Sequence, residues 1–317
     1  MFVSAPSGRR RARATRMRTF AAFAAAAVTA SLIGAAPAAG KPAPPPPGPA
    51  GAAPGAPGGS STWTTGAKTG IGTSTTVASK VWHTLAQGVL TEVYYPTVDV
   101  ANVQDLQLVV SDGATFTELE RDATTQQTRL LDPSSLTYQQ INTDRDGRYR
   151  IDKTYVTDPQ RSTVLVDIRV RSLDGGTYTP YVLYNPSLAN TGTGDSGDAA
   201  GQALLARDGT VASALVAKPA FTRISSGFSG TSDGWTDLRT DHDLDWTYKT
   251  AAAGNLVQVG QLAPADGGKP SDTTIALSFG ASQNAALGTA NASLRLPFSA
   301  TRDAYVDGWH AYLASIA

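Results

Sequence analysis

The segment Gln87-Gly-Val-Leu-Thr-Glu-Val-Tyr-Tyr-Pro96 carries the pattern that decides the fold of this 317-residue chain. Two sets of residues alternate along it, Val89, Thr91 and Val93 in one set and Leu90, Glu92 and Tyr94 in the other. A period of two predicts a β-strand with one buried face. Pro96 has no backbone N–H, so we expect the strand to end there or to lie at a sheet edge.

The same alternation recurs between Lys80 and Ala281, in short segments separated by turn sequences. The turns are Asp112-Gly113, Asp146-Gly147, Asp174-Gly-Gly176 and Asp208-Gly209. We count roughly fifteen strands at the spacing typical of sandwiches, and the last turn predicts a hairpin between residues 203–206 and 211–216. Strands do not alternate with helices, which disfavours a parallel sheet. We therefore predict an all-β fold, a large antiparallel β-sandwich (a supersandwich) over residues 63–281.

The period changes near the C-terminus. Ser282 is predicted to cap a helix that Pro297 stops, and Ser299 is predicted to cap a second helix. Large apolar residues fall at helical spacing on one face of the second helix, namely Tyr305, Trp309, Tyr312, Leu313 and Ile316. We interpret residues 282–317 as a helical linker whose aromatic stripe needs a surface to cover it.

Residues 1–38 have the organisation of an export signal. An arginine-rich start precedes the apolar run Phe20–Ala36, and Ala36-Pro-Ala38 is a small-residue cleavage site. The alternative is a transmembrane anchor, but the run is short and dominated by alanine. We expect a secreted protein, by either the Sec or the twin-arginine route. Residues 39–62 are rich in Pro, Gly and Ala, which predicts a disordered linker.

The composition excludes several classes of function. The 26 basic and 26 acidic residues balance, so the chain has no global basic field and nucleic acid is not expected as a partner. Cysteine is absent, which excludes disulfides, thiolate nucleophiles and Cys-ligated metals. Only 16% of residues are charged, as is typical of exported β-rich proteins.

Catalytic and metal-binding residues are hard to find. Cleavage of a glycosidic bond needs two carboxylates, and the three glutamates are Glu92, Glu118 and Glu120. Glu118 and Glu120 share a segment that we predict to face solvent, and Glu92 has no evident partner, so we assign no catalytic residue. The cluster Asp241-His-Asp-Leu-Asp245 could bind Ca²⁺. It lacks the glycine and glutamate of a calcium loop, so a solvated acidic turn is preferred and no cofactor is predicted.

Aromatic residues are the candidates for ligand binding. Tyr94 and Tyr95 must point to opposite sides of a strand, so at most one can lie in the core while the other can stack on a sugar. Glu92 shares the predicted face of Tyr94 and could orient its hydroxyl or a sugar hydroxyl. Trp235, in a Gly-rich polar segment, is either a corner plug or a ligand platform. The alternative for both tyrosines is ordinary core and surface packing.

An ordered set of segments resembles a known family. The segments are Gly88–Pro96, Asp105–Gly113, Leu131–Tyr138, Gly147–Ile151, Lys153–Pro159, Tyr181–Ser187 and Gly230–Leu238. In this order and spacing they resemble the N-terminal domain of bacterial glucoamylases and glucodextranases, of the glycoside hydrolase family 15 type. The resemblance runs from about Trp63 to the last residue.

The resemblance implies a non-catalytic β-sandwich of an exported α-glucan hydrolase. In that family the acid and base belong to a following (α/α)6 barrel, which we expect in cis beyond the helical linker or in a separate chain. The sandwich would pack on the barrel and shape its substrate funnel, and this chain alone would be inactive. The alternatives are a free-standing carbohydrate-binding protein and a structural domain without a ligand.

Overall fold

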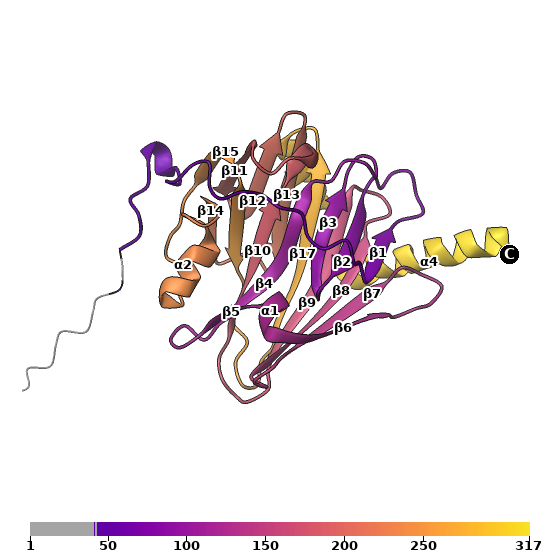
Figure 1. Cartoon of the computed structure of the whole chain (residues 1–317). Coiled ribbons are helices and arrows are strands. Elements are labelled where there is room, and N and C mark those ends of the chain that lie inside the picture. Colours follow the sequence, from indigo (N-terminus) through magenta and orange to yellow (C-terminus); the bar gives the residue numbers. More distant parts are fainter. Residues whose placement is uncertain (1–40, 42) are drawn as a thin grey trace, which may run out of the picture. The chain divides into compact units, whose positions relative to one another are not determined.

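The computed structural model of the protein describes residues 41 and 43–317, which form two antiparallel β-sheets packed face to face (Figure 1). The first sheet has the order β1-β2-β3-β4-β10-β16-β14, with β5 beside β4, and the second has the order β15-β11-β12-β13-β17-β9-β8-β7-β6. The predicted antiparallel β-sandwich is therefore confirmed.

The strands of the first sheet are β1 (Gly70–Thr73), β2 (Trp82–Ala86), β3 (Val89–Tyr94), β4 (Val103–Ser111), β5 (Thr117–Leu119), β10 (Thr179–Pro186), β14 (Arg223–Phe228) and β16 (Leu256–Gln261). Those of the second are β6 (Thr124–Leu130), β7 (Tyr138–Asp144), β8 (Tyr149–Thr157), β9 (Thr163–Ser172), β11 (Asp195–Ala200), β12 (Ala203–Asp208), β13 (Val211–Lys218), β15 (Thr250–Gly254) and β17 (Ser271–Gly280). The helices are α1 (Glu120–Ala123), α2 (Gly234–Asp241), α3 (Gln283–Ser293) and α4 (Phe298–Ile316), with 3₁₀ turns at Pro49–Gly51 and Leu188–Asn190.

The core between the sheets follows from the alternation in the sequence. Every second residue of β9, from Val164 to Val170, is buried in this core and meets apolar side chains of the first sheet such as Leu108 and Val182. The predicted hairpin is also confirmed, because β12 and β13 pair through Asp208 and Val211. Gly209 in this turn has φ +54°, a conformation that glycine adopts without steric cost.

Helix α3 covers the outer face of the second sheet. Ser282 caps it as predicted, and its hydroxyl accepts a hydrogen bond from the backbone N–H of Ala285 at 3.2 Å. Its small residues Ala286 and Ala290 are fully buried against a second apolar cluster that includes Leu165 of β9. Alanine lets the helix approach the sheet closely, so this layer extends the core outward.

The predicted start of the second helix is wrong. Helix α4 begins at Phe298, directly after Pro297, and Ser299 lies inside its first turn. The carbonyl of Pro297 already accepts the N–H of Ala300, so the proline itself stands at the cap position, where its missing N–H costs nothing.

The aromatic stripe of α4 is divided into a packed half and an exposed half. Tyr305 is buried, and the indole N–H of Trp309 donates to the carbonyl of Thr73 at 3.0 Å. Further along, the side chains of Tyr312, Leu313 and Ile316 are 48%, 37% and 64% exposed. Figure 1 shows this end of α4 extending past the sandwich. The chain therefore covers the first half of the stripe with its own strands.

The linker that we predicted to be disordered lies along strands in the structure. The N–H of Ala53 donates to Thr250 of β15 at 2.7 Å, and the carbonyl of Pro57 accepts from the N–H of Asn255 at 2.8 Å. The Ser232 hydroxyl donates to the carbonyl of Pro54 at 2.7 Å. The segment has few side chains to bury, but its backbone carbonyls find donors on the sandwich, and this orders it. The compact unit begins at Lys41, rather than at residue 63.

The predicted signal peptide, residues 1–38, lies outside the described residues. Within residues 41 and 43–317, no helix combines the length and the apolar character that crossing a bilayer requires.

Candidate functional site

A hollow of about 460 Å³ lies beside the end of β3 and brings two of the predicted residues together. Glu92 and Tyr94 line it together with Trp63, whose side chain is 46% exposed. The remaining lining residues are Thr64, Thr65, Gly66, Lys68, Ala101 and Asn190. We refer to this feature as the Trp63 hollow.

The carboxylate of Glu92 is held at the base of the hollow. It forms an ion pair with Lys68 and accepts hydrogen bonds from the Thr64 hydroxyl at 2.6 Å and the Thr84 hydroxyl at 3.2 Å. Burial would raise the pKa of the Glu92 carboxyl, but the ammonium of Lys68 and the hydroxyl of Thr64 outweigh it and lower this pKa below its ordinary value. Glu92 is therefore ionised at neutral pH and serves as an anchor for neighbouring side chains rather than as a proton donor.

Tyr94 is half-buried at the rim of the hollow. Burial, followed by the nearby charge of Glu92, raises the pKa of its hydroxyl. We expected Glu92 to orient this hydroxyl, but in the described chain the hydrogen bonds of Glu92 go to Lys68, Thr64 and Thr84 instead. The strict alternation of β3 also fails, because Leu90 and Val93 both enter the core opposite a register shift in β2.

Tyr95 points away from the hollow and packs against the core. Its ring stacks on Phe279 of β17 with a centroid separation of 5.5 Å. Asn102 donates to its carbonyl at 2.7 Å, which fixes the turn that follows the strand. The two tyrosines thus divide as the alternation predicts, with one ring on the core and the other at the surface hollow.

Trp235 belongs to a different hollow. It lies in the first turn of α2, where Asp233 caps the helix by accepting from the N–H groups of Trp235 at 2.9 Å and Thr236 at 3.0 Å. The partly buried indole packs on an apolar cluster that includes Val257. The hollow beside it measures about 290 Å³ and shares no lining residue with the Trp63 hollow. The four predicted residues therefore do not form one site.

Sequence reasoning missed the other residues of the Trp63 hollow, among them Trp63, Lys68 and Asn190. Trp63 could have been proposed from its position as the first aromatic after the Pro/Gly/Ala-rich segment. Lys68 gave no signal, because its partner Glu92 is 24 positions away. Asn190 stabilises the rim by accepting from the N–H of Ala101 at 2.7 Å and donating to the carbonyl of Asp99 at 2.9 Å.

The other two glutamates contact cations outside the hollow. Glu118 pairs with Arg148 at 2.6 Å. Glu120, which we predicted to face solvent, is fully buried, and both of its oxygens lie 2.7 Å from the ammonium of Lys153. One oxygen also accepts from the N–H of Leu108. That prediction was wrong because the short helix α1 turns the Glu120 side chain inward, toward β8.

The chain matches a family model, a curated relative and a solved structure. Residues 53–314 match the family model described as glucodextranase, domain N. A glucoamylase of Clostridium sp. (strain G0005) is 33% identical over 261 residues, which cover 80% of this chain and 37% of that protein. The crystal structure of a bacterial glucoamylase complexed with acarbose matches with a TM-score of 0.78 and 32% identity, over 82% of this chain and 39% of that one. This chain therefore spans less than two-fifths of the length of either relative.

Proposed function

This chain belongs to the family of the glucodextranase N-terminal domain, and from that premise we propose that it is the non-catalytic β-sandwich of an exported α-glucan hydrolase. The relatives are glucoamylases, which supports α-linked glucan as the substrate class. The residues that would cleave the glycosidic bond belong, in this proposal, to an (α/α)6 barrel in cis or in trans. The sandwich by itself is then inactive toward glucans.

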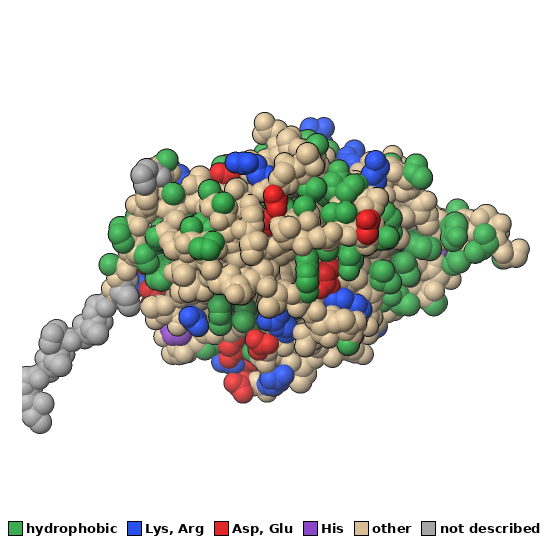
Figure 2. Space-filling view, turned by 45° about the horizontal axis from the view of Figure 1, so that its top comes forward, with side chains coloured by type: hydrophobic (Ala, Val, Ile, Leu, Met, Phe, Trp, Pro, Cys, Tyr) green, Lys and Arg blue, Asp and Glu red, His purple; other side chains and the backbone are tan. Residues whose placement is uncertain are grey.

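The exposed end of α4 supports an interface with that barrel. Tyr312, Leu313 and Ile316 present apolar surface on a helix that extends past the sandwich, and Figure 2 shows hydrophobic side chains gathered on this projection. Isolated apolar residues are common on protein surfaces, but a contiguous set on a projecting helix is typical of an interface. Complete burial of each side chain would contribute about 1.5–3 kcal/mol. We propose that this end of α4 contacts the barrel.

The Trp63 hollow is the feature that supports a role in substrate binding. An exposed indole and a half-buried phenol line a surface cavity together, and flat rings of this kind stack on the apolar face of a pyranose. The bound carboxylate of Glu92 keeps the floor of the hollow polar. We propose that this hollow holds a glucose unit at one rim of the substrate funnel.

Export is the remaining part of the proposal. The arginine-rich start, the apolar run and the small-residue site of residues 1–38 support removal of the segment close to Ala38. Mass spectrometry of the extracellular protein should then find a first residue within a few positions of Ala39. Recovery of the intact N-terminus in the cytoplasm would contradict export.

The test of the hollow is calorimetric titration of the purified chain with maltooligosaccharides and isomaltooligosaccharides, alone and with a barrel domain added. Trp63→Ala and Tyr94→Ala should weaken binding with little change in melting temperature. Tyr95→Ala should lower the melting temperature, because its ring packs on Phe279. Trp235→Ala is the matched control, since this tryptophan lines the other hollow.

The outcomes separate the proposed function from its alternatives. Binding that is unaffected by the Trp63 and Tyr94 substitutions would place the sugar elsewhere. An absence of any binding, with or without the barrel, would favour a structural domain without a ligand. Sugar binding by the chain without any effect on a barrel would favour a free-standing carbohydrate-binding protein.

A further inference from the structure

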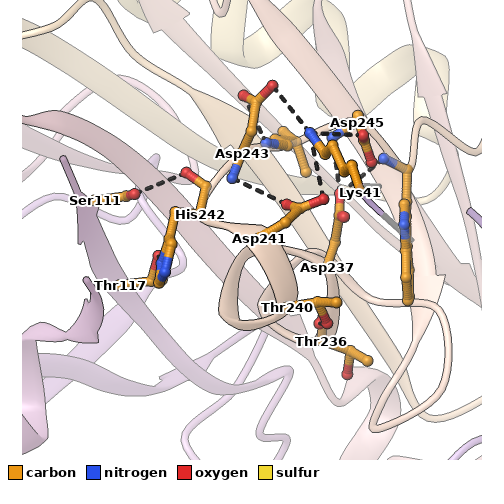
Figure 3. Close-up of polar contacts among 12 residues, drawn as sticks. Lys41, Ser111, Thr117, Thr236, Asp237, Thr240, Asp241, His242, Asp243 and Asp245 are labelled. Atoms are coloured by element: carbon orange, nitrogen blue, oxygen red, sulfur yellow. Dashed lines mark hydrogen bonds and ion pairs between the residues drawn. The ribbon is translucent and has the colours of Figure 1, made fainter. Parts of the chain in front are cut away.

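Three aspartates spaced four residues apart meet at the end of α2 (Figure 3). Asp237 and Asp241 lie one turn apart on this helix, and Asp245 follows in the next loop. His242 ends the helix in a left-handed conformation, with φ 71°, and turns the chain back toward it. As a result, one carboxylate oxygen of each aspartate lies within 4.8 Å of those of the other two.

Backbone N–H groups orient two of these carboxylates. One oxygen of Asp237 accepts from the N–H of Asp245 at 2.8 Å and from the N–H of Trp246 at 2.7 Å. One oxygen of Asp241 accepts from the N–H of Asp243 at 3.2 Å. Within the described chain, the second oxygen of Asp237 and one oxygen of Asp245 are buried without a hydrogen-bond partner. The fold therefore holds three carboxylates close together and leaves two of their buried oxygens without a hydrogen-bond donor.

Lys41 supplies positive charge to the rim of this cluster but does not pair with its deepest member. Its ammonium lies 2.8 Å from Asp245, 3.3 Å from Asp241 and 3.5 Å from Asp243, and its side chain is 42% exposed. No ion pair to Asp237 exists among the described residues, although Asp237 is fully buried. A buried carboxylate without a counter-ion is costly.

We propose that Asp237, Asp241 and Asp245 bind a hard divalent cation, Ca²⁺, and that Lys41 competes with the ion for the rim carboxylates. Ca²⁺ takes oxygen ligands at about 2.3–2.6 Å, so two ligands of one ion can stand up to about 5 Å apart. It also tolerates irregular geometry, with water completing the coordination sphere. An ion at this point would reach the unpartnered oxygen of Asp237, to which the ammonium of Lys41 forms no ion pair among the described residues.

The ion would connect elements that the lysine connects only at the surface. Asp237 and Asp241 belong to α2, and Asp245 belongs to the loop before β15. Coordination would join helix and loop from the inside. The segment that begins at Lys41 would then lose its contact with the cluster.

The experiment is calorimetric titration of the purified chain with CaCl₂, together with melting curves in Ca²⁺, in Mg²⁺ and in chelator. We expect a dissociation constant of about 10⁻⁴ to 10⁻³ M, the range of extracellular calcium modules, and a higher melting temperature in Ca²⁺. Asp237→Asn retains an acceptor for the two N–H groups, so the chain should fold, but Ca²⁺ should bind at least about tenfold more weakly. Lys41→Ala should tighten Ca²⁺ binding.

Asp146→Asn is the matched control. Asp146 belongs to a second acidic group, with Glu118 and Asp144, which already surrounds the guanidinium of Arg148. This substitution should leave the response to Ca²⁺ unchanged. Asp245→Asn is the second test variant and should lose Ca²⁺ binding as Asp237→Asn does. The proposal is overturned if neither the natural chain nor Lys41→Ala binds Ca²⁺ at about 5 mM, well above the expected constant. It is equally overturned if both aspartate variants bind the ion as the natural chain does.

Discussion

Acidification should destabilise the sandwich through His83, a buried residue of β2. The side chain is fully buried, and within the described chain neither ring nitrogen has a hydrogen-bond partner. Burial lowers the pKa of the imidazole from 6.5 to about 4. The native state therefore keeps a neutral ring while the unfolded chain takes up a proton. The contribution of His83 to stability is therefore fully present above pH 6.5 and is lost as the pH falls from 6.5 toward 4.

The size of the effect follows from the two pKa values. One pKa unit corresponds to about 1.36 kcal/mol, and between pH 7.5 and pH 5 the shift from 6.5 to about 4 integrates to a loss of about 2 kcal/mol in the free energy of unfolding. Two carboxyl groups act in the opposite direction over the same range. Burial raises the pKa of Asp195 to about 8 and that of Asp237 to about 7. The raw pH dependence therefore sums several contributions.

The assay is urea unfolding at both pH values for the natural chain and for His83→Leu. Leucine cannot titrate, and replacing an imidazole that has no partner removes no hydrogen bond. The difference between the two pH dependences isolates His83 and should be about 2 kcal/mol. His310→Leu is the control, because that ring is on the surface beside Asp132. Equal pH dependences for the natural chain and His83→Leu would mean that the imidazole accepts a proton in the native state, and the reasoning would be refuted.

Three further predictions concern stability and association. Lys153→Met should cost about 3–5 kcal/mol in urea unfolding, because it leaves the buried carboxylate of Glu120 without its counter-ion. A loss below 1 kcal/mol would contradict the burial of that pair. Tyr305→Ala should cost about 3–5 kcal/mol, whereas Ile316→Ser should leave the melting temperature unchanged. Without a barrel to cover it, the exposed end of α4 should cause weak self-association in sedimentation, which Ile316→Ser should reduce. Equal melting temperatures for the two variants would show that the helix does not pack as described. Gly72→Ala should lower the melting temperature by several degrees, because the added Cβ would lie 2.3 Å from the buried imidazole of His83. An unchanged melting temperature would mean that this ring can move away.

The fold was predictable because its signals are local. Alternation and Asp-Gly turns are properties of a few consecutive residues, and they indicated the hairpin at Asp208 and the antiparallel strands between Lys80 and Ala281. The division of Tyr94 from Tyr95 followed from the same rule. The chain deviates from regular pleating at the register shift opposite β3. There the alternation wrongly placed Leu90, which lies in the core, on the same face as Glu92.

Features that depend on distant partners were not predictable. Nothing near Glu120 in the sequence identifies Lys153, which is 33 positions away, so a buried ion pair was predicted to be a solvated surface. Lys68 escaped notice for the same reason, although it holds Glu92 in the Trp63 hollow. The Pro/Gly/Ala-rich segment has no hydrophobic pattern, so its order comes from partners such as Thr250 that the sequence does not reveal.

The course of that segment also affects how the protein behaves in a crowded solution. Strand β15 ends the second sheet, and an edge strand offers unpaired backbone groups to other chains. Here Ala52 and Ala53 occupy part of that edge, next to Thr250. Their neighbours include Pro49 and Pro54, which have no N–H to donate to a further strand. The segment therefore acts as a terminator of the sheet, and its removal should expose an edge on which fibril-like strand addition can begin.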